Sequence, residues 1–126
     1  MESFLDEVES TLGPVTVWIN NAGIMPIGSV LDQDDALVRR AVDINVLGVM
    51  NGARAAARRM VARGGGRIVN VASIAGRMPA PGMAIYTATK FAAVGFGDAI
   101  KLRAPNGLIA GVNSKTWLWI HSNVIT

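Results

Sequence analysis

The sequence of 126 residues contains no cysteine and a single histidine, His121. Without cysteine the chain can form neither disulfide bonds nor a thiolate metal site, and a lone histidine gives no cluster of metal ligands. The composition is consistent with a reducing, cytoplasmic environment. We therefore predict no metal centre and assign His121 no role.

Charged residues are also scarce, at 17% of the chain, whereas 51% of the residues are hydrophobic. This balance excludes a disordered tail, and the length suits one domain with a buried core. The long uncharged run over 10–31 is interrupted by three glycines and two prolines, so it does not predict a membrane-spanning helix. The acidic first nine residues are unlike a secretion signal. We expect a cytoplasmic protein that does not bind membranes.

The net charge is +3, and four arginines crowd one predicted helix, namely Arg54, Arg58, Arg59 and Arg63. A basic cluster of this kind can bind nucleic acid, or it can be a solvated helix face whose last arginines complement the helix dipole. No aromatic stacking platform and no nucleic-acid motif accompany the charges. We favour the second interpretation and expect no nucleic-acid partner.

Helical and strand patterns alternate along the chain. Apolar spacing predicts helices over about 3–11, 32–63 and 85–103, and β-branched or apolar runs predict strands over 15–20, 67–73 and 108–112. Right-handed crossovers between such strands give a parallel sheet. The prediction is an α/β fold: a partial Rossmann-like, doubly wound parallel sheet of about three strands with helices on both faces.

The last residues do not fit this alternation. After Asn113 the sequence contains two tryptophans and has no clear period, and at most a short strand around 117–120 is compatible with it. We therefore divide the chain into a domain over 1–113 and an atypical tail over 114–126.

The stretch 73–90 combines a hydroxyl, a phenol and an amine. Tyr86 and Lys90 are four residues apart, so on a helix their side chains share one face. A cation beside a phenol favours the phenolate form and makes the pair a candidate proton donor and acceptor. Ser73 and Asn20 each stand at the carboxyl end of a predicted strand, so both lie at the edge of the sheet where such folds bind ligands.

Four motifs occur together in register: Asn20-Asn-Ala-Gly23, Asn45 in Asp-Ile-Asn-Val-Leu-Gly, Ser73 in Ile-Val-Asn-Val-Ala-Ser, and Tyr86-x-x-x-Lys90. Each motif alone is weak, since a tyrosine four residues before a lysine is usually an ordinary pair on a helix surface. Together they resemble the short-chain dehydrogenase/reductase family, including the thirteen residues from Ser73 to Tyr86.

The resemblance implies hydride transfer between NAD or NADP and a small carbonyl compound or secondary alcohol. It implies that Tyr86 exchanges the proton with the substrate oxygen and that Lys90 holds the nicotinamide ribose and favours the phenolate. It further implies that Ser73 hydrogen-bonds the carbonyl group and that Asn45 positions a proton-relay water.

The same resemblance implies that Asn20, Ala22 and Gly23 line the adenosine side of the cofactor, with Tyr86 and Lys90 on its nicotinamide side. Each motif also has a plain structural interpretation. The Asn20 segment can be only a turn, and Ser73 or Asn45 can serve as a cap or a buried amide beside a helix distortion.

The sequence departs from the family at its beginning, because no glycine-rich cofactor turn of the form G-x-G-x-x-G is present. We therefore expect a truncated cofactor half, weak or no binding of NAD(P)H by this chain, and an open sheet edge along the strand over 15–20. An alternative function is a catalytically silent interaction module that pairs with a full-length relative, or with a second copy, through the helices of Asn45 and Tyr86. The sequence specifies neither the substrate nor the choice between NAD and NADP.

Overall fold

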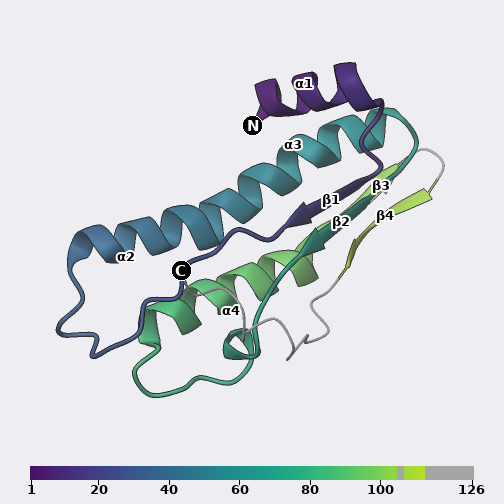
Figure 1. The fold of residues 1–126 in the computed structure, drawn as a ribbon. Helices are drawn as coiled ribbons and strands as arrows, with labels where there is room; N and C mark the ends of the chain where they lie inside the picture. The colour runs from purple at the N-terminus through teal and green to yellow at the C-terminus, as the bar shows by residue number, and fades with distance from the viewer. Residues whose placement is uncertain (105–106, 113–126) are drawn as a thin grey trace.

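The computed structural model describes residues 1–104 and 107–112 (Figure 1). In chain order the elements are α1 (Glu2–Leu12), β1 (Val17–Asn20), α2 (Asp35–Val42), a π-helical turn (Asp43–Gly48), α3 (Val49–Ala62), β2 (Arg67–Asn70), a 3₁₀ turn (Ile74–Gly76), α4 (Ala84–Ala99), β3 (Lys101–Ala104) and β4 (Gly107–Val112). The three predicted helices and three predicted strands are all present.

The strands form one sheet in the order β1-β2-β4-β3, in which β1, β2 and β4 are parallel. In the register of β1 and β2, Trp18 lies opposite Ile68 and Asn20 lies opposite Asn70. Within the described residues β1 is an edge strand, as expected from the sequence. The α/β fold with a partial parallel sheet is confirmed.

The helices lie on one face of the described sheet, whereas the sequence led us to expect helices on both faces. Ile68 packs with α3, and Phe96 and Ile100 at the end of α4 pack against the same cluster. On the opposite face, Val17 and Ile19 are more than half exposed. The reason is topological: β1, β2 and β4 advance in one direction across the sheet, so both right-handed crossovers place their helices on the same side.

The third helix is also shorter than predicted. It ends at Ala99 rather than near residue 103, and residues 101–104 form β3, which pairs antiparallel with β4. Ile100 already has an extended backbone, although its N–H still donates to Phe96 O. Backbone hydrogen bonds to β4 thus replace the last helical turn that the sequence pattern allows.

The core between α3 and the sheet is built from small residues and one long side chain. Ala53, Ala56 and Ala57 of α3 pack with Met60 and with Ile68 of β2. Small side chains let the helix axis approach the sheet closely. The small side chains of α3 thus serve helix-on-sheet packing.

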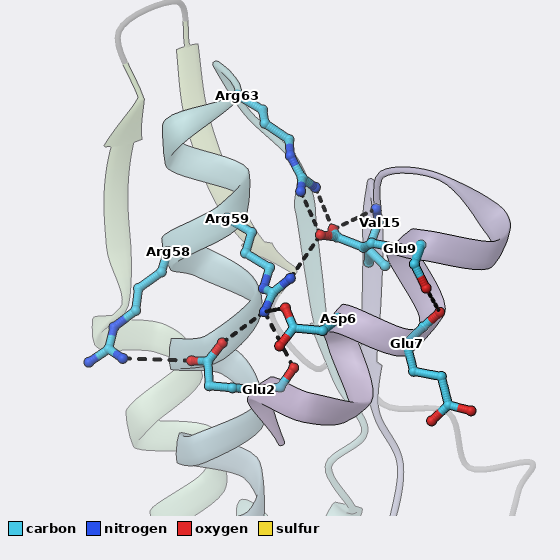
Figure 2. Close-up of polar contacts among 9 residues, drawn as sticks. Glu2, Asp6, Glu7, Glu9, Val15, Arg58, Arg59 and Arg63 are labelled. Atoms are coloured by element: carbon cyan, nitrogen blue, oxygen red, sulfur yellow. Dashed lines mark hydrogen bonds and ion pairs between the residues drawn. The ribbon is translucent and has the colours of Figure 1, made fainter.

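Ion pairs join α1 to the last two turns of α3 (Figure 2). Arg59 contacts Glu2, Asp6 and Glu9 at 3.1, 2.7 and 2.9 Å, and Arg63 forks onto both carboxylate oxygens of Glu9. These guanidinium groups hold the pKa of Glu9 well below its usual range. Arg58 also lies 3.7 Å from Glu2, so three of the four clustered arginines pair with carboxylates of α1.

The predicted tail over 114–126, its short strand and His121 lie outside the described residues, so the domain division remains a prediction. Across 1–104 and 107–112, no helix is long and apolar enough to cross a membrane. The same part of the chain holds no group of three or more histidine, aspartate or glutamate side chains placed to bind a metal ion.

Candidate active site

Lys90 lies in the second turn of α4, close to the point where β2 ends. Its Nζ donates to Val71 O at 3.2 Å and lies 5.7 Å from the centroid of the Tyr86 ring. The two residues are 7% and 4% exposed. Burial lowers the pKa of the Lys90 amine. The phenol and the amine therefore share one buried helix face, as their spacing predicted.

Asn45 lies in the π-helical turn and is almost fully buried. Its Oδ1 accepts a hydrogen bond from Ile24 N at 2.8 Å, and its Nδ2 donates to Ile24 O at 2.8 Å. The second Nδ2 proton goes to Thr89 Oγ1 at 2.9 Å. This side chain thus connects the loop after β1 with the helix that carries Tyr86.

Gly23 lies between these groups. A Cβ atom built at this position would be 3.3 Å from Asn45 Oδ1 and 3.6 Å from Lys90 Nζ. The loop after β1, the π-helical turn and α4 therefore converge within a few ångströms. A side chain at this position would occupy space beside Asn45 and Lys90 that glycine leaves open.

Ser73 is half-buried and precedes the 3₁₀ turn, where its Oγ accepts from Ala75 N at 3.2 Å. This bond is the capping role considered from the sequence, and it leaves the hydroxyl proton available for another acceptor. The turn is fixed against α4, because a Cβ on Gly76 would be only 2.8 Å from Lys90 O. Ser73 is thereby held on a segment that packs directly on the Tyr86 helix.

Asn20 ends β1 with its side chain turned toward α3. Its Oδ1 accepts from Trp18 Nε1 at 2.7 Å, and its Nδ2 donates to Asn70 Oδ1 at 2.8 Å and to Val49 O at 3.2 Å. The carboxamide of Asn20 is therefore used within the core. Ala22, two residues further along, is exposed.

The structure brings Gly23, Asn45, Tyr86 and Lys90 together, with Ser73 on the adjoining turn, whereas the side chain of Asn20 points away from them. Sequence reasoning missed Thr89. It lies three residues after Tyr86, so helical spacing already placed it on the same side of α4. The contribution of Val71 is a backbone carbonyl, for which a sequence carries no signal.

The sequence model of the short chain dehydrogenase family matches residues 1–110, a span that contains every one of these positions. The chain belongs to this family. Among short chain dehydrogenase relatives, 3beta-hydroxysteroid dehydrogenase 2 of Eggerthella lenta is 39% identical over 97 residues, which are 75% of this chain and 37% of that protein. The 2-(S)-hydroxypropyl-CoM dehydrogenase 3 of Xanthobacter autotrophicus is 42% identical over 90 residues, which are 71% of this chain and 35% of that protein.

A solved structure gives the same assignment. The gluconate 5-dehydrogenase of Burkholderia cenocepacia, crystallised with NADP and tartrate, superposes with a TM-score of 0.72 at 33% identity over 76% of this chain and 38% of that chain. The short chain dehydrogenase segment described here thus spans well under half the length of these proteins. The comparisons support an oxidoreductase family and give no support to the interaction-module alternative.

Proposed function

We propose that the buried Tyr86 and Lys90 pair serves proton transfer in the NAD(P)-dependent interconversion of a small carbonyl compound and a secondary alcohol. The observation that carries this proposal is the convergence of Tyr86, Lys90, Asn45 and Gly23 at the carboxyl ends of β1 and β2. Ligands of parallel α/β sheets bind beyond these strand ends.

A nicotinamide cofactor would supply the hydride to the carbonyl carbon, or accept it in the reverse direction. The residues beside Lys90 fit such a group. Gly23 leaves open the space that a side chain would fill between Asn45 and the amine. A charged lysine has three N–H donors, of which Val71 O accepts one, so the remaining donors suit ribose hydroxyl groups. In this proposal Lys90 and the backbone of 20–23, including Asn20 and Ala22, hold the cofactor.

Tyr86 would donate its phenolic proton to the substrate oxygen during reduction and recover it during oxidation. The amine of Lys90 favours the phenolate that this exchange leaves behind. Ser73 would donate its hydroxyl proton to the same oxygen as negative charge grows there. The three groups therefore have separate tasks at one atom of the substrate.

The proposed role of Asn45 is to hold a relay water. Both of its amide protons are already donated, to Ile24 O and Thr89 Oγ1. A water beside Asn45 must therefore be bound by an oxygen atom of this residue, either Oδ1 or the backbone carbonyl.

The test is a carbonyl-reductase assay of the full chain with NADH and with NADPH, each at millimolar concentration because weak binding is expected. A panel of small ketones should be reduced by the wild type and not by Tyr86→Phe, which keeps the ring and removes only the hydroxyl. Lys90→Met should raise KM for the cofactor and lower kcat. Absence of turnover that depends on Tyr86 would refute the proposal for this chain.

We also propose an oligomeric state and a cellular location. Members of this family generally form oligomers, so we propose a homo-oligomer as the working state, to be measured by light scattering. We also propose a cytoplasmic location, in keeping with the absence of cysteine.

A further inference from the structure

Thr89 makes two hydrogen bonds inside the candidate site. It lies between Tyr86 and Lys90 on α4 and is 3% exposed. Its hydroxyl donates to Tyr86 O at 2.8 Å, and its Oγ1 accepts from Asn45 Nδ2 at 2.9 Å. A threonine hydroxyl has only one proton, and here the helix carbonyl takes it. The oxygen of Thr89 can therefore face only the amide end of Asn45, not its carbonyl end.

The orientation that Thr89 favours is the one in which Asn45 pairs with the loop after β1. With its Nδ2 toward Thr89, Asn45 donates to Ile24 O and accepts from Ile24 N. Rotating the carboxamide by about 180° would exchange its oxygen and nitrogen. Oδ1 would then face Thr89 Oγ1 and Ile24 O, and the NH₂ group would face the Ile24 N–H. All three hydrogen bonds would be lost together.

We propose that Thr89 is a positioning residue, whose hydroxyl fixes the orientation of the Asn45 carboxamide and thereby holds the Gly23–Ile24 segment beside Lys90. A Cβ atom at Gly23 would lie 3.6 Å from Lys90 Nζ, so the segment runs close to the amine. A shift of this segment therefore changes the space in front of Lys90. The benefit to catalysis rests on the proposed function, whereas the positioning itself does not.

The chain offers a matched control on the same helix. Thr87 is also buried, and its Oγ1 has no hydrogen-bond partner within the described residues. Thr87→Val and Thr89→Val therefore remove the same hydroxyl from neighbouring buried positions, but only the second removes hydrogen bonds. Thr89→Ser keeps the hydroxyl and loses only a methyl group.

The first measurement needs neither cofactor nor turnover. Hydrogen exchange of the Ile24 amide, followed by NMR in the full chain, should be accelerated about tenfold or more in Thr89→Val, because its acceptor Asn45 is no longer held. Exchange in Thr89→Ser and Thr87→Val should stay within about threefold of the wild type, and amides of α3 should be unchanged in all variants. Equal exchange of Ile24 in Thr89→Val and the wild type, or equal acceleration in Thr87→Val, would overturn the proposal.

If Thr89→Val does not fold, the wild type alone still decides the geometry. A cross-peak between an Asn45 Nδ2 proton and the Thr89 methyl group is expected, and its absence would refute the contact. Where the chain turns over, Thr89→Val should lower kcat by roughly 10- to 100-fold with little change in KM, and Thr89→Ser should restore it. An inactive wild type with the expected exchange pattern would refute the proposed function and leave the positioning role of Thr89 supported.

Discussion

Replacing Gly52 by alanine tests the closest approach between α3 and β1. A Cβ at Gly52 would overlap Asn20 Oδ1 and lie 2.9 Å from Trp18 Nε1, and these two atoms are themselves hydrogen-bonded. Such overpacking costs about 1–3 kcal/mol, and weakening the buried hydrogen bond costs about 1 kcal/mol more. Alanine regains about 1 kcal/mol through its higher helix propensity. The net expectation is a loss of about 1–3 kcal/mol in the free energy of unfolding.

The control for this prediction is Gly95→Ala on α4. A Cβ at Gly95 would have no atom within 4 Å, so only the propensity gain of about 0.5–1 kcal/mol should remain, and the variant should be more stable than the wild type. Urea denaturation followed by circular dichroism measures both changes. Equal effects of the two substitutions, or a stabilising effect of Gly52→Ala, would contradict the packing of α3 on β1.

Three further predictions concern the site and α1. Gly76→Ala should shift the turn that carries Ser73 away from α4, because its Cβ would be 2.8 Å from Lys90 O; a melting temperature lowered by several degrees and altered NMR shifts around Ser73 are expected. Burial lowers the pKa of Lys90, so the wild type should gain stability relative to Lys90→Met as the pH rises through the folded pKa toward the ordinary value of 10.5; parallel pH curves would contradict this. The pKa of Glu9 is lowered by Arg63, so its contribution is complete above the ordinary value of 4.5 and is lost as the pH falls below it; Glu9→Gln should flatten this acid loss in denaturation curves.

The sequence predicted those parts of the fold that depend on local patterns. The order of helices and strands and the parallel pairing followed from periodicity and crossover rules, whereas the edge position of β1 followed from the family resemblance. The sequence did not predict which faces of the sheet the helices cover, because an apolar run such as 15–20 has the same composition whether one face or both faces are covered. Val17 and Ile19 are as apolar as a buried strand requires, yet both are exposed on the uncovered face.

Contacts between distant segments could not be predicted from the sequence. The paired arginines and the carboxylates of α1 are 50 or more residues apart, and only the folded chain shows that they pair. In the site, spacing predicted that Tyr86 and Lys90 share a helix face. The partners of Asn45 could not be predicted, because two of its hydrogen bonds go to the backbone N–H and C=O of Ile24. Almost every residue has these two groups, so the sequence does not single out Ile24.

The π-helical turn explains how one continuous helical segment serves both the core and the site. Within the turn Ile44 and Gly48 are only half-buried, whereas Asn45 and Val49, four residues apart, are buried. At 3.6 residues per turn, residues four apart drift steadily around a helix, and a wider turn cancels this drift. Asn45 and Val49 are therefore both buried, and Asn45 donates to Thr89 of α4 while the carbonyl of Val49 accepts from Asn20 of β1. The distortion considered from the sequence as a mere accommodation of a buried amide is thus what aligns the site with the core, and the bonds of Asn45 to Ile24 and Thr89 hold it in place.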